Sequence, residues 1–174
     1  MLRKTNPDIM EAKELIIEKV KSQFGDAILE TSDFRNDLTL VIDPNKNVEI
    51  ARFLRDDQDL QFAACKDVTA IDWATRKNRF TVVYHLYSLK LKLTLRVKAT
   101  IADASNPQIE SLTPVWNSAN WYERETWDMY GIKFLNHPDL RRMYMPEEFE
   151  YFPLRKEFPV LGIPGSIPLP KRED

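Results

Sequence analysis

The clearest pattern of hydrophobic and polar positions in this sequence lies between residues 89 and 98. Apolar side chains stand there at every second position, namely Leu89, Leu91, Leu93, Leu95 and Val97. Successive side chains of a β-strand point to opposite faces of the sheet, so this alternation predicts a strand with one buried and one solvent-exposed face. The exposed face carries Lys90, Lys92, Thr94, Arg96 and Lys98.

Weaker patterns predict the elements before this strand. Apolar residues at near-helical spacing predict an amphipathic helix that has Asn6 as its cap, Pro7 in its first turn and Gly25 at its end. Residues 27–34 and 38–43 have the composition of two strands joined by a tight turn. The other expected elements are a short helix over 46–55 and strands over 62–73 and 79–87.

The order of these elements predicts an α+β fold with a mostly antiparallel sheet that helices cover on one face. A third helix is expected over 118–130, capped by Asn117 and closed by Gly131. From Pro153 onward, closely spaced prolines exclude a continuous helix or a central strand, which predicts an extended Pro-rich C-terminal tail. We therefore divide the chain into an α+β domain, 1–130, and an interface segment with its tail, 131–174, that docks on a partner.

Charge and cysteine content restrict the function. The 174 residues carry a net charge of −2, so no global basic field recruits nucleic acid or anionic lipid. The one cysteine, Cys65, excludes an internal disulfide and a multi-thiolate metal or iron–sulfur site, and the four glycines form no phosphate-binding loop. No stretch approaches the ~20 apolar residues of a membrane span. We expect no cofactor and no metal in this chain.

Residues 123–159 are unusually dense in charges and rings, with fourteen charged residues, eight aromatics and four prolines. A core cannot hold so many charges unpaired, which predicts a network in which Arg124 pairs with Asp128 one helical turn away. We expect Arg141, Arg142, Arg155 and Lys156 to extend this network against Glu147, Glu148, Glu150 and Glu157. Mixed aromatic and arginine content is typical of buried protein–protein interfaces.

Two other classes of function remain open. The basic face of the strand over 89–98 fits a sheet-based RNA-binding module, although aromatic side chains are missing from that face. The carboxylates of Glu125 and Asp128 fit acid–base catalysis by a small enzyme, but a structural ion pair with Arg124 is the favoured explanation. His85 is expected to be structural, and His137 to shape a turn.

The dense segment resembles the signature region of the C-type subunit of NADH:quinone oxidoreductase, which is the 30-kDa-type subunit of respiratory complex I. The matching residues are Glu123-Arg124-Glu125, Asp128, Tyr130-Gly131, His137-Pro138-Asp139, Arg141-Arg142, Pro153 and Arg155-Lys156. The chain departs from the family pattern at Asn136, where glycine is usual, and at Phe149, Tyr151 and Phe152, which replace tryptophan and glycine-histidine. Asparagine is the next-best residue for a positive φ angle, so the turn at Asn136 is expected to survive.

The resemblance implies a subunit without a redox centre in the hydrophilic peripheral arm. Its partners would be the quinone-pocket subunit of the D type and the iron–sulfur subunits, which hold FMN, iron–sulfur clusters, NADH and quinone while quinone reduction drives proton translocation. It would lie on the cytoplasmic side of a bacterial inner membrane, or on the matrix side in mitochondria. A related energy-converting hydrogenase or ferredoxin-fed complex is the alternative. Charge reversal at Arg141 and Arg142 is expected to lower recovery of the assembled complex.

Overall fold

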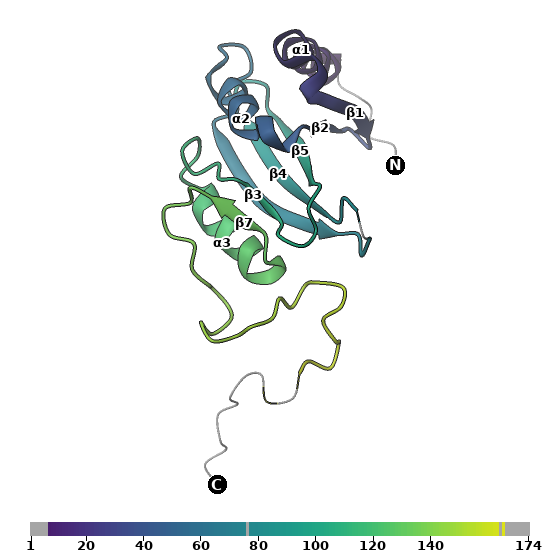
Figure 1. Ribbon diagram of the computed structural model, residues 1–174. Coiled ribbons are helices and arrows are strands. Elements are labelled where there is room, and N and C mark those ends of the chain that lie inside the picture. Colours follow the sequence, from purple (N-terminus) through teal and green to yellow (C-terminus); the bar gives the residue numbers. More distant parts are fainter. Residues whose placement is uncertain (1–6, 76, 164, 166–174) are drawn as a thin grey trace.

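The computed structural model describes residues 7–75, 77–163 and 165 (Figure 1). Two strands follow the first helix, three longer strands follow the second, and a third helix comes after them. The elements are α1 Pro7–Phe24, β1 Ile28–Phe34, β2 Asp37–Ile42, α2 Asn47–Asp56, β3 Ala64–Asp72, β4 Phe80–Ser88, β5 Leu93–Ile101, β6 Gln108–Glu110, α3 Ala119–Tyr130 and β7 Lys133–Leu135. Short 3-10 turns at Gly25–Ala27 and Pro44–Lys46 lead into β1 and α2.

Five strands form a mixed sheet in the order β1-β2-β5-β4-β3. All neighbours are antiparallel except β2 and β5, which run parallel because α2, β3 and β4 intervene between them in the sequence. The predicted hairpin of β1 and β2 is confirmed. Arg35 and Asn36 form its two-residue turn with φ of 55° and 72°, the left-handed conformation that fits the twist of a hairpin.

The core lies on one face of this sheet. Every second residue of β5 is buried, and its partners on β4 and β2 are buried in register. Ile50 and Leu54 of α2 face Tyr84 and Val97 across a small enclosed space, and Figure 1 shows α1, α2 and α3 on this covered side. The predicted α+β fold with helices over one face is confirmed.

Two local predictions are corrected. The strand of the alternating segment begins at Leu93 rather than residue 89, because Lys92 has a φ of 54° and residues 89–92 form the turn between β4 and β5. Lys90 therefore leaves the strand face and donates to the carbonyl oxygen of Gln58 (2.6 Å). Ser118, not Asn117, occupies the N-cap of α3, without a side-chain capping bond. The predicted cap Asn6 lies outside the described residues.

The chain after α3 folds back beneath this helix (Figure 1). β7 pairs in parallel with β6, a short pairing that the sequence pattern did not reveal. Between Pro153 and residue 163 consecutive turns form, with Arg155 N donating to Phe152 O and Phe158 N to Arg155 O, so this part is not one extended run. The rest of the predicted tail, residue 164 and residues 166–174, lies outside the described part. No described helix is long and apolar enough to cross a membrane.

Candidate functional site

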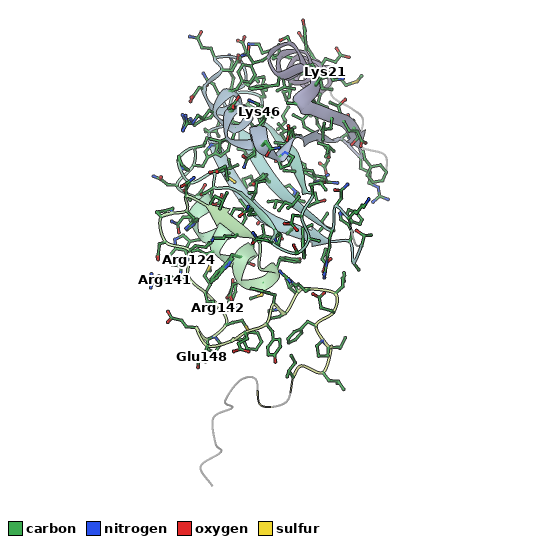
Figure 2. All side chains as sticks on the ribbon, viewed as in Figure 1. Lys21, Lys46, Arg124, Arg141, Arg142 and Glu148 are labelled. Atoms are coloured by element: carbon green, nitrogen blue, oxygen red, sulfur yellow. The ribbon has the colours of Figure 1, made fainter. Side chains whose placement is uncertain are left out.

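The signature residues lie on α3 and on the chain that follows it, which contacts both ends of the helix. Gly131 ends this helix in the left-handed conformation (φ 73°), and the chain later returns so that Leu154 N donates to Met129 O (3.1 Å). Figure 2 shows Arg124, Arg141 and Arg142 beside α3, with Lys21 and Lys46 at the opposite end of the molecule. The site is therefore one helix with a non-helical segment wrapped around it.

The carboxylate of Asp128 is the centre of this site. Its side chain is fully buried, and Oδ2 accepts the backbone N–H groups of Met143 (3.0 Å), Tyr144 (2.8 Å) and Met145 (3.0 Å). Oδ1 accepts Arg142 Nη1 at 2.6 Å. Burial alone would raise the pKa of Asp128, but these donors outweigh it and hold the pKa below its usual range. One ionised carboxylate thus fixes the backbone of 143–145.

The side chain of Arg142 connects α3 with the chain around residues 149–152. Its guanidinium also donates to the carbonyl oxygens of Phe149 and, at 3.3 Å, of Tyr151. The same group lies 5.4 Å from the ring centre of Phe152 and 5.6 Å from that of Trp127. Planar contact with rings combined with hydrogen bonding to several acceptors suits arginine and not lysine. Of the aromatic residues that depart from the family pattern, Phe149 and Phe152 thus place their rings beside Arg142, and Tyr151 contacts it through its carbonyl oxygen.

The predicted pairing of Arg124 with Asp128 is wrong. Arg124 instead donates to the carbonyl oxygens of Arg141 (3.2 Å) and Arg142 (3.3 Å), and its guanidinium lies 4.7 Å from the ring centre of Trp121. Asp128 takes its counter-charge from Arg142, fourteen residues later in the sequence. Both arginines therefore hold the same segment against α3, one through its backbone and one through a buried ion pair.

Glu123 holds the chain that leads into α3. Its fully buried carboxylate accepts Ser111 Oγ at 2.6 Å and Leu112 N at 2.7 Å. Burial raises the pKa of Glu123 to about 7, because these two donors offset only part of the lost hydration. Glu125, the next acid of the motif, is half-buried on α3 and does not share this environment.

His137 shapes the turn, as the sequence predicted. Its Nε2 lies 3.1 Å from the carbonyl oxygen of Asn120, and its Nδ1 accepts the backbone N–H of Asp139 (3.0 Å), so a neutral ring with the proton on Nε2 satisfies both contacts. Burial lowers the pKa of His137, although the carbonyl oxygen of Asn120 and the carboxylate of Asp139 act in the opposite direction. Asn136 has a φ of 60° and donates to Glu110, so the turn tolerates asparagine here.

The two arginines of the motif have different surroundings. Arg141 makes a bidentate pair with Asp139 at 2.7 and 2.9 Å, and its side chain is 64% exposed. The side chain of Arg142 is 8% exposed. Pro138, before this pair, is exposed. The side chain of Arg141 thus lies at the surface, whereas that of Arg142 is part of the fold.

The return of the chain depends on the absence of a side chain at Gly131. A Cβ atom there would lie 2.6 Å from both Arg155 Nη2 and the Phe152 ring. Arg155 Nε donates to the carbonyl oxygen of Tyr130 (2.7 Å), and its guanidinium lies 4.6 Å from the centre of the Phe152 ring. Pro153, between these groups, is half-buried. The guanidinium of Arg155, which lies over the Phe152 ring, therefore caps the C-terminal end of α3.

Sequence reasoning missed a second anchor of this segment. Asp72, at the end of β3, accepts Arg79 Nε (2.7 Å), Arg79 Nη2 (2.6 Å) and the backbone N–H of Lys156 (2.9 Å). Arg79 also contacts the carboxylate of Glu157. Arg79 foremost holds the pKa of Asp72 well below its usual range. No local pattern marks this cluster, because Asp72 and Lys156 are 84 residues apart.

The geometry gives little support to the two other functions considered, an RNA-binding module and a small enzyme. Arg96, on the exposed face of β5, donates to His85, Thr39 and Asp37, and Tyr87 lies on the same face, where no aromatic residue was expected. Acidic neighbours interrupt the basic face that RNA binding needs. Asp128 already has four donors and lies away from solvent. Among the described residues, no group of three His, Cys, Asp or Glu side chains is placed to hold a metal ion.

Comparisons with known proteins agree on a family. The profile of the family described as the 30 Kd subunit of respiratory-chain NADH dehydrogenase matches residues 40–163. The C-type subunit of NADH-quinone oxidoreductase from Geobacter sulfurreducens is 45% identical over 145 residues, which are 83% of this chain and 88% of the relative. The C-type subunit from Roseiflexus sp. (strain RS-1) is 43% identical over 145 residues, 83% of each chain.

Two solved structures share the fold. The trypsin-resistant fragment of Nqo5 superposes with a TM-score of 0.61 at 27% identity, over 74% of this chain and 99% of that one. A chain of the membrane-bound sulfane sulfur reductase, an archaeal respiratory membrane complex, superposes with a TM-score of 0.72, over 85% and 86% of the two chains. At 23% identity the second likeness concerns the fold alone.

Proposed function

This chain belongs to the family of the 30 kDa subunit of respiratory-chain NADH dehydrogenase, and from that membership we propose that it is a structural subunit of the peripheral arm of a proton-translocating NADH:quinone oxidoreductase. It holds no redox centre in this role. FMN, iron–sulfur clusters, NADH and quinone bind to its partners, which include the quinone-pocket subunit of the D type and iron–sulfur subunits. It reaches the membrane only through them, on the cytoplasmic side in bacteria or the matrix side in mitochondria.

One observation carries the docking part of this proposal: the segment after α3 buries the charge of Arg142 against the helix and leaves several large apolar side chains exposed. The guanidinium groups of Arg142 and Arg155 donate hydrogen bonds to α3. In contrast, Tyr144 is 59% exposed, and Val160 and Leu161 are fully exposed. Large apolar side chains that gather exposed in one part of the chain are typical of an interface that a partner covers. Residues 131–174 are in this proposal the docking region.

Charge reversal at Arg141 tests the docking role. Arg141→Glu removes an exposed cation and one surface ion pair, so the chain is expected to fold normally while its partners are lost. Arg142→Glu would disrupt the fold and cannot separate the two effects. Lys46→Glu is the matched control, because Lys46 also forms an exposed ion pair, with Glu49, at the other end of the molecule (Figure 2).

The measurement is purification of the tagged chain from detergent-solubilised membranes, followed by identification of its partners and assay of NADH-driven quinone reduction. We expect the wild-type chain and the Lys46→Glu variant to recover flavin and iron–sulfur subunits with activity, and Arg141→Glu to recover several-fold less. A wild-type chain that is recovered alone would refute the proposal. Recovery of a hydrogenase or of a ferredoxin-fed complex instead would refute NADH as the electron donor and support that related class of complex.

A further inference from the structure

A hollow with a volume of about 520 Å³ lies beside the His137 turn and the first turn of α3. Its walls come from three separate segments of the chain. They are formed by Thr113, Pro114, Asn117, Asn120, Trp121, Asn136 and Pro138. The hollow is wide and open to solvent, which suits a surface segment of a partner better than an enclosed small molecule. None of the buried charged groups of the signature lines it.

Trp121 is the dominant apolar group of this hollow and is held in advance of binding. Its side chain is 60% exposed, and the guanidinium of Arg124 stacks on its ring at 4.7 Å. Arg124 is itself fixed by the carbonyl oxygens of Arg141 and Arg142. A large exposed ring that loses little freedom on binding is the kind of residue that contributes most to interfaces.

The polar side chains that line the hollow are neutral: three asparagine amides and the hydroxyl of Thr113. Asn117 and Asn120 each present donors and an acceptor, which match the N–H and C=O groups of an extended backbone. His137 contacts the carbonyl oxygen of Asn120, and the side chain of Asn136 donates to Glu110. These contacts fix both segments of the wall in place. The side chains of Asn117, Asn120 and Asn136 carry no charge, so the hollow itself offers an occupant no ion pair.

We propose that this hollow receives an extended, uncharged segment of a partner subunit, with a proline or another apolar side chain seated on Trp121. Extended segments of this kind dock in aromatic-lined grooves at low entropic cost. Pro138 continues the hollow directly into the exposed Asp139 and Arg141 pair, so the segment and the Arg141 contact belong to one interface. The inference rests on the proposed function and specifies the partner chemistry of this part of the docking region.

Site-specific cross-linking in the assembled complex tests the occupant. A photo-reactive phenylalanine analogue replaces the exposed Asn117, and the cross-linked peptide is sequenced from the purified complex. We expect a cross-link to an uncharged, non-helical segment of a partner subunit. A cross-link to a helix, to a charged segment or to lipid, or no cross-link in a complex that contains the chain, would overturn the proposal.

Substitution of Trp121 gives a second measurement. Trp121→Ala is expected to lower the amount of partner recovered per tagged chain about 10-fold, as loss of a hot-spot residue does. Trp73→Ala is the matched control, because Trp73 is 55% exposed and lies outside the hollow. Equal recovery for Trp121→Ala and wild type overturns this inference alone, whereas a wild-type chain without partners overturns the proposed function as well.

Discussion

Replacement of Asp128 by asparagine is the sharpest test of how the docking segment is held. The substitution keeps the shape of the side chain and removes its charge. Asparagine has one oxygen and one NH₂ group, so the NH₂ group must face either Arg142 Nη1, which lies 2.6 Å from Oδ1, or the three backbone N–H groups near Oδ2. Either orientation places donors against donors and leaves the buried Arg142 cation without its counter-charge.

The expected cost follows from these contacts. Breaking a buried ion pair by removing one partner costs about 3–5 kcal/mol. The affected segment lies outside the five-stranded sheet, so we expect this loss to appear as local opening of residues 142–158 and not as global unfolding. A change of about 4 kcal/mol corresponds to roughly a 1,000-fold change in an equilibrium constant.

Hydrogen exchange at pH 7 measures this opening directly. The amide protons of residues 143–145 are expected to exchange about 1,000-fold faster in Asp128→Asn, while those of β4 and β5 change little. Asp139→Asn, which breaks the exposed pair with Arg141, should leave the protection of 143–145 unchanged. Because the pKa of Asp128 is lowered by folding, its contribution is present above about pH 4 and is lost as the pH falls below that value. Protection of 143–145 within tenfold of wild type in the asparagine variant would refute this account.

Three further predictions concern neighbouring residues. Folding raises the pKa of Glu123 to about 7, so its contribution to the free energy of unfolding is present at acid pH and is lost as the pH rises to 7. In urea titrations, Glu123→Gln should remove up to about 3 kcal/mol of this pH dependence. An unchanged pH profile would contradict the assignment. Gly131→Ala should destabilise the chain by about 2–4 kcal/mol in the same titrations, against about 1 kcal/mol for Gly162→Ala, which has the same φ of 73° but open space around it. Arg79→Ala should release the segment around Glu157 and increase limited proteolysis between residues 157 and 163 several-fold; equal cleavage rates would show that Arg79 is not an anchor.

The local features of the fold were predictable because neighbouring residues determine them. Alternation along β5, helical spacing in α1, and the residues at Arg35, Asn36 and Gly131 that take positive φ angles all act within a few positions of the sequence. Errors occurred at boundaries, such as the turn at 89–92. The parallel pair of β6 and β7 was missed because three residues are too few to show a period.

The sequence by itself determined the fold class, the family signature and the crowding of charges and rings after α3. Only the tertiary structure decided which charges meet: Asp128 pairs with Arg142 and not with Arg124, and Asp72 collects Arg79 and the backbone of Lys156. In a segment with fourteen charged residues many pairings satisfy charge balance. The choice among them depends on where the return of the chain past Gly131 places each group, and that path is set by long-range packing.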